Sequence, residues 1–142
     1  MLKLRLVMAL CCLVTWSQTA SAMSIRNTSL VFANHGMCSA AFDIDSGLEE
    51  MSDVKIYYQV LNEVADPIDN GMFLIDHFGY STASRFERVY LEKEALCEEA
   101  LTLKITKATA VINGKKVDLI QFADLREEKF KPMKIIINSH RN

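Results

Sequence analysis

Proline, glycine and excess positive charge are all scarce in this sequence. Its 142 residues include only 2 Pro and 5 Gly, and half of them are hydrophobic. That composition excludes a collagen-like repeat and a disordered polypeptide. Sixteen Lys and Arg stand against 18 Asp and Glu, so the chain has no basic excess to neutralise nucleic-acid phosphates. The length predicts one domain.

Catalytic and metal-binding motifs are missing as well. The sequence has no Gly-x-Ser-x-Gly, no phosphate-binding glycine loop and no His-Glu-x-x-His. The histidines, His35, His77 and His140, do not have the four-ligand spacing of a zinc site, and the segment from Asp43 lacks the glycine and glutamate of a calcium loop. We therefore expect no enzyme, no cofactor and no metal. A small hydrolase or metal carrier is the alternative.

The long hydrophobic run is confined to the N-terminus. Two basic residues precede an unbroken apolar stretch over 6–14 that is too short to span a bilayer, and Ala20-Ser21-Ala22 matches a cleavage site. The pattern predicts a signal peptide over residues 1–22, cleaved between Ala22 and Met23. A buried N-terminal helix is the alternative. We expect a secreted or periplasmic protein with no membrane anchor.

Two cysteines remain beyond the predicted signal peptide, Cys38 and Cys97. An even number of cysteines in an oxidising compartment favours a disulfide, and the alternation around Cys38 directs its side chain toward the core. We predict that the two cysteines are joined. A reactive thiol near His35 is the alternative.

The dominant period of residues 23–142 is two, which is typical of half-buried β-strands. Apolar and polar residues alternate over 38–45 and over 54–60. Asn113-Gly114 predicts a type I′ hairpin turn. Other expected elements are strands at 25–33, 72–78, 82–91, 101–112 with a bulge, 116–122 and 133–138, a hairpin turn at 66–71, a helical turn or two at 92–100, and a polar excursion at 123–129.

Seven or eight short strands with regularly spaced turns are the pattern of an antiparallel β-sandwich. The only tryptophan, Trp16, falls within the predicted signal peptide, so the buried Trp of a true immunoglobulin domain is missing. We therefore predict an all-β, fibronectin type III-like (immunoglobulin-like) antiparallel β-sandwich over residues 23–142.

Aromatic and arginine residues that the core periodicity does not use are candidates for a protein-binding surface, because Tyr and Arg are enriched at interface hot spots. The alternative is that they fill the sandwich or its rim. Strand 82–91 has apolar residues on both faces, which predicts a homodimer whose interface includes this strand or the segment 72–80, unless 123–129 covers the surplus. The candidates are Tyr57, Phe78, Tyr80, Arg85, Arg88 and Tyr90.

Four segments resemble the IrmA family, small exported bacterial proteins named as interleukin receptor mimics. They are 54–60 (Val-Lys-Ile-Tyr-Tyr-Gln-Val), 71–76 (Gly-Met-Phe-Leu-Ile-Asp), 101–108 (Leu-Thr-Leu-Lys-Ile-Thr-Lys-Ala) and 113–115 (Asn-Gly-Lys), and the similarity extends over about residues 24–138. The resemblance implies a fibronectin type III-like fold, a dimer and binding of host cytokines, but no individual binding residues. A periplasmic structural or assembly component, such as a pilus-related β-sandwich with strand donation at an exposed edge, is the alternative function.

Overall fold

The computed structural model describes residues 22–98, 100–122, 125–127 and 133–138, so the predicted signal peptide lies outside it except for Ala22. No helix within these ranges has the length and apolar character needed to cross a membrane. The elements are β1 (Ser24–Phe32), β2 (Cys38–Asp45), β3 (Met51–Leu61), β4 (Pro67–Phe78), β5 (Phe86–Lys93), the 3₁₀ helix η1 (Glu94–Cys97), β6 (Thr102–Ile112), β7 (Lys115–Asp118), α1 (Leu119–Phe122), β8 (Arg126–Glu127) and β9 (Lys134–Ile137).

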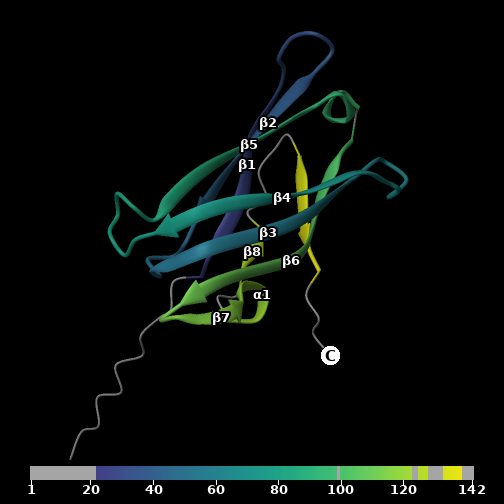
Figure 1. The fold of residues 1–142 in the computed structure, drawn as a ribbon. Helices are drawn as coiled ribbons and strands as arrows, with labels where there is room; N and C mark the ends of the chain where they lie inside the picture. The colour runs from purple at the N-terminus through teal and green to yellow at the C-terminus, as the bar shows by residue number, and fades with distance from the viewer. Residues whose placement is uncertain (1–21, 99, 123–124, 128–132, 139–142) are drawn as a thin grey trace, which may run out of the picture.

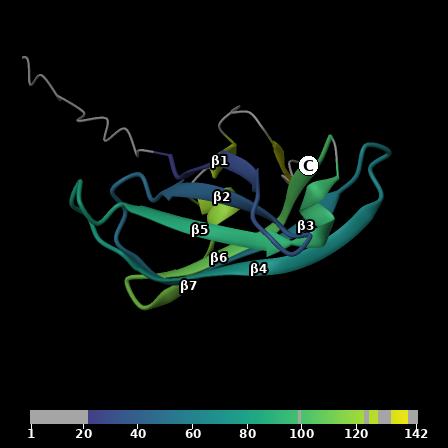
Figure 2. The same ribbon diagram turned by 90° about the horizontal axis from the view of Figure 1, so that it is seen from above.

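Two sheets pack face to face (Figure 1; Figure 2). Sheet A has the strand order β5-β2-β1-β8, and sheet B has the order β4-β3-β6-β7, with β9 also paired to β6. In sheet B the fourth strand joins the third, whereas an immunoglobulin constant domain places it beside the fifth. The predicted all-β, fibronectin type III-like sandwich is confirmed.

Both sheets are mixed rather than purely antiparallel. Strand β8 runs parallel to β1, and β9 runs parallel to the first half of β6. These two short strands come from the C-terminal part of the chain, where the sequence gives only weak alternation. Their direction depends on how that segment returns across the sandwich, which local periodicity does not encode.

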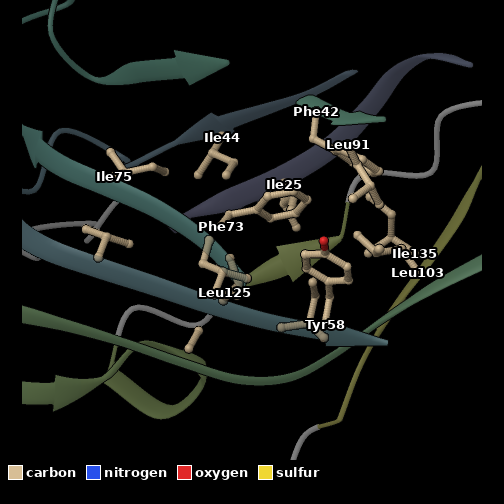
Figure 3. Packing of buried hydrophobic residues seen from close by; sticks show 14 of the residues in the cluster. Ile25, Phe42, Ile44, Tyr58, Phe73, Ile75, Leu91, Leu103, Leu125 and Ile135 are labelled. Carbon is tan, nitrogen blue, oxygen red and sulfur yellow. The ribbon is translucent and has the colours of Figure 1, made fainter. Parts of the chain in front are cut away.

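The alternation along β2 and β3 builds the core as predicted. Phe42 of sheet A meets Phe73 of sheet B with ring centroids 5.3 Å apart, and Phe73 also lies 4.6 Å from the ring of Tyr58 (Figure 3). Burial of such side chains contributes about 1.5–3 kcal/mol each, so these rings hold the two sheets together. The buried residues are Cys38, Ala40, Phe42 and Ile44 on β2, and Val54, Ile56, Tyr58 and Val60 on β3.

The predicted bulge and hairpin turn of β6 are also present. The register between β6 and β3 shifts between Tyr57 and Tyr58 of β3. Along β6 the buried residues change from odd numbers, ending at Ile105, to even numbers, beginning at Ala108. Asn113 and Gly114 have φ of 49° and 72°, as a type I′ turn requires.

Three predicted boundaries in the hairpins are wrong. The turn before β4 is at 62–66 rather than 66–71, because the Asn62 side-chain oxygen accepts hydrogen bonds from the N–H groups of Val64 and Asp66. Strand β5 begins at Phe86 rather than residue 82, because a serine-closed turn at 81–84 precedes it. Strand β7 ends at Asp118, whose carboxylate accepts hydrogen bonds from the N–H groups of Ile120 and Gln121 in α1.

The remaining predicted elements fall near their observed positions. The 3₁₀ helix η1 is the predicted helical turn that carries Cys97. Strand β9 lies within the predicted final strand 133–138. Of the predicted polar excursion, residues 123, 124, 128 and 129 lie outside the described residues, and 126–127 form β8.

Candidate protein-binding surface

Strand β5 is an edge strand of sheet A, and its alternation separates core from surface. Leu91 is buried and Val89 packs against the core, on the inner side of the strand. Phe86, Arg88 and Tyr90 lie on the other side, with exposed fractions of 50% for Phe86, 62% for Tyr90 and 53% for the Arg88 side chain. We call these three residues the β5 stripe. The apolar surplus predicted for this strand therefore faces outward.

A shared carboxylate fixes the arginine of the stripe. Asp43 lies opposite Arg88 in the β2–β5 register. The Arg88 Nε and Nη2 atoms donate to Asp43 Oδ1 and Oδ2 at 2.5 and 3.0 Å. From the other side, Arg26 on β1 donates to Asp43 Oδ2 at 3.4 Å. One aspartate on the middle strand thus holds arginines from both neighbouring strands.

A second arginine–aspartate pair supports the aromatic ring at the start of the stripe. The Nε atom of Arg85 donates to Asp45 Oδ1 at 2.7 Å, and its Nη2 atom contacts Asp45 Oδ2. The guanidinium carbon of Arg85 lies 4.9 Å from the centre of the Phe86 ring. Both charged side chains are about one-fifth exposed. Arg85 therefore positions Phe86 and has little surface of its own to offer a partner.

The ion pairs keep this face charged at neutral pH. Hydrogen bonding by Arg88 holds the pKa of the Asp43 carboxyl below its ordinary value against the opposing effect of burial, and Arg26 adds to the lowering. The same hydrogen bonds raise the pKa of Arg88, with a further contribution from Tyr90. The β5 stripe thus presents a permanently charged, fixed guanidinium between two aromatic rings.

An open hollow lies on the same face of sheet A. The combination of an arginine, two exposed rings and an adjoining hollow has the residue composition of an interface hot spot. The hollow is lined by Arg26, Asp43, Phe86, Glu87 and Arg88.

The other predicted candidates lie elsewhere. Tyr57 is half-buried on the outer face of sheet B, with its ring 5.7 Å from the Lys107 ammonium. Tyr80 is highly exposed in the loop before β5. Phe78 is fully buried opposite Met51, so it belongs to the core rather than to a surface.

Sequence reasoning did not identify Asp43 and Arg26 as parts of this surface. The alternation along β2 placed Asp43 on the solvent side correctly. Its pairing with Arg88 depends on a register between strands 45 residues apart, for which the sequence holds no local signal.

The predicted disulfide is present and borders this surface. Cys38 and Cys97 are bonded, with their Cα atoms 5.2 Å apart. The bond ties the first residue of β2 to η1, which directly follows β5. It therefore secures one end of the strand pair that displays the stripe. Within the described ranges, no group of three or more His, Cys, Asp or Glu side chains could hold a metal ion.

Strand order and burial together define a fibronectin type III-like β-sandwich. The family model for IrmA, interleukin receptor mimic protein A, matches residues 23–128, and the chain belongs to this family. A solved structure, described as the structural characterization of IrmA from Escherichia coli, matches with a TM-score of 0.62 and 26% identity. The match covers 81% of this chain and 98% of that one. None of the curated proteins matches the sequence.

Proposed function

We propose that this chain is an exported protein that binds a host interleukin through the β5 stripe. The observation that carries the proposal is the outward display of Phe86, Arg88 and Tyr90 on an edge strand whose inner side is anchored in the core. Membership of a family named for interleukin receptor mimicry supports the choice of ligand. The predicted signal peptide and the disulfide support export, because disulfides persist in oxidising compartments.

The fixed arginine favours tight binding. Immobilising a long side chain at an interface costs about 0.5–1.5 kcal/mol, and Asp43 has already restricted Arg88 before a partner arrives. Asp43 accepts two of the five guanidinium N–H donors, so donors remain for a carboxylate or carbonyl group of the partner. The flanking rings supply apolar contact area.

Surface plasmon resonance against a panel of human interleukins tests the proposal. The chain from residue 23 should bind at least one of them, and the double variant R88A/Y90A should weaken that binding at least about tenfold, as loss of hot-spot residues does. Tyr57→Ala, which removes a ring from the opposite face, is the matched control and should bind normally. An absence of binding by the native chain, or equal losses in both variants, would refute the proposal.

A homodimer through the same region is the second candidate. Strands β4 and β5 are the free edges of their sheets on one side of the sandwich, and the ion pair between Lys93 and Asp69, at 3.2 Å, bridges them. The predicted interface, at 82–91 or 72–80, includes parts of both strands.

The pilus-related function is distinguished by location. A protein that binds host ligands is expected in the culture medium, whereas an assembly component is expected to remain with the fimbrial fraction. Immunoblots of the two fractions separate these possibilities.

A further inference from the structure

The outer face of sheet B carries a line of lysines. Lys104 and Lys107 lie on β6, while Lys116 of β7 pairs with Val111 and Lys134 of β9 pairs with Thr102. Paired residues share one face of a sheet, and the inner side of β6 is occupied by its buried residues. The four lysines, which we call the lysine row, therefore follow β6 on its solvent side for about 25–30 Å at 3.3 Å per residue.

In the part of the chain that the structure describes, none of the four lysines makes an ion pair. Of the nearby acids, Asp53 pairs with Lys55 at 2.8 Å. Asp118 pairs with Thr109 and so lies on the face of the row, where its carboxylate accepts hydrogen bonds from two N–H groups of α1 and offsets the four cations only in part. Asp76 lies on β4, which is separated from β6 by β3. A positive row on this face therefore persists although the whole chain has a net charge of −2.

The surroundings of the row are polar and aromatic. The Lys107 ammonium lies 5.7 Å from the ring centre of Tyr57, and a hollow beside it is lined by Thr106, Lys107, Asp118, Ile120 and Gln121. Among the described residues, no exposed large hydrophobic side chain lies on β6, β7 or β9. A membrane-binding surface combines cations with adjoining apolar side chains that enter the lipid. The exposed apolar residues of this face, Met72 and Leu74, lie on β4, which β3 separates from the row.

We propose that the lysine row binds a linear sulfated polysaccharide. Four cations along one strand, offset only in part by Asp118, match a chain that repeats anionic groups along its length. Hydroxyl, amide and aromatic groups next to the row suit the sugar rings between the sulfates. The acidic residues of sheet A have only a weak influence on a ligand at the lysine row, because salt screens charges over a Debye length of about 8 Å at physiological ionic strength. This site is independent of the β5 stripe, which lies on the opposite face of the sandwich.

Heparin is the probe for this site. A fluorescent heparin oligosaccharide should bind the chain from residue 23 in 0.15 M NaCl, with an affinity that falls as salt rises. The variant K104Q/K107Q should raise the Kd about tenfold or more. It should also make the salt dependence of the Kd shallower, because a protein with fewer cations displaces fewer counterions from heparin. The matched control is R26Q/R88Q, which removes the same charge from the opposite face and should change the Kd less than about twofold. Melting temperatures well above the assay temperature and circular dichroism spectra like that of the native chain would verify that both variants are folded.

Three results would overturn the proposal. Heparin binding that is absent at 0.15 M NaCl, or that falls equally in both double variants, would refute a site at the lysine row. Tighter binding to phosphatidylserine vesicles or to single-stranded DNA than to heparin would refute a sulfated polysaccharide as its ligand. Neither outcome depends on whether an interleukin binds sheet A.

Discussion

The outer faces of the two sheets differ in how their basic side chains are paired. On sheet A, Asp43 holds Arg88 and Arg26, and Asp45 holds Arg85. On sheet B, the lysine row has no partners among the described acids. Exposed ion pairs add little stability, so the sheet A pairs matter chiefly for the positions of the arginines and of the Phe86 ring.

This difference distinguishes the two proposed binding surfaces. A fixed guanidinium between exposed rings recognises a partner by shape and by directed hydrogen bonds. Unpaired, mobile ammonium groups attract a polyanion without fixed geometry, and they lose affinity in salt. The sandwich keeps both on one small scaffold because its two outer faces point in opposite directions.

The largest expected effect is the loss of stability when the disulfide at the end of the β2–β5 pair is removed. The disulfide closes a loop across 59 residues, and its loss should lower the free energy of unfolding by about 4 kcal/mol on the chain-entropy model. The variant C38A/C97S, which avoids placing a hydroxyl at the buried position of Cys38, should show this loss in urea unfolding. Native protein unfolded in reductant should match it.

Hydrogen exchange then locates the effect. Amides of β5 and η1 should lose more protection than amides at the β3–β4 pairing, because the bond holds η1 against the start of β2. Equal loss of protection in both sheets would contradict this assignment.

The second effect concerns the residue that links the two sheets. Asn27 of β1 is fully buried, and its side-chain N–H groups donate to the carbonyls of Ser29 and Ala41 at 2.9 Å each. Its Oδ1 atom accepts from the N–H of Met133, directly before β9 of sheet B, at 3.0 Å. Asn27→Ala should cost about 3 kcal/mol, because buried groups lose their partners.

Thr28→Ala is the control for that substitution. The Thr28 hydroxyl donates to the Ala41 carbonyl at 3.3 Å and is not fully buried, so its removal should cost under about 1 kcal/mol. Urea unfolding of both variants makes the measurement. Similar losses in the two would show that the link to Met133 has no special weight.

Local periodicity predicted the inner faces of the strands but not the contacts between distant strands. The inward faces of β2 and β3 follow from alternation, and so do the bulge of β6 and the inward Cys38. The segment of β5 has apolar residues on both faces, so alternation did not determine which of its faces is buried. The Asp43–Arg88 pair requires the β2–β5 register, which arises only when the sheet assembles.

Phe78 illustrates the same limit within a single strand. Strict alternation from Phe73 and Ile75 directs Phe78 outward, yet it is buried. The inward parity also changes in the neighbouring strand β3, between Met51 and Val54, where Asp53 has a positive φ of 49°. A coordinated change in two paired strands cannot be seen in either segment alone.

The third effect tests association through the edge of sheet A. We expect the chain from residue 23 to sediment as a homodimer at micromolar concentration, because the exposed rings of the β5 stripe form an apolar surface on an edge strand. Arg88→Glu and Tyr90→Glu should each raise the dimer Kd at least about tenfold, as hot-spot substitutions do. Lys107→Glu on sheet B should leave it unchanged.

Two sedimentation results would contradict that expectation. A single monomer-sized species that does not change with concentration would exclude the dimer. A dimer that persists in both β5 variants would place the interface elsewhere, with the 72–80 segment of β4 as the next region to substitute.

The smallest expected effect is a dependence of the free energy of unfolding on pH that arises from the Asp43 carboxylate of sheet A. Arg88 holds the folded-state pKa of Asp43 below its ordinary value of 3.8, so the carboxylate contributes stability above about pH 4 and loses it as the pH falls through the folded value. Asp43→Asn has no carboxylate to protonate, so its free energy of unfolding should fall less than that of the native protein between pH 5 and pH 2.5, by urea unfolding at each pH. Lys107→Gln should follow the native curve, because it leaves the ion pairs of sheet A intact. Parallel curves for native protein and Asp43→Asn would mean that the arginines do not stabilise the Asp43 carboxylate, and that Arg88 is not held in place before a partner binds.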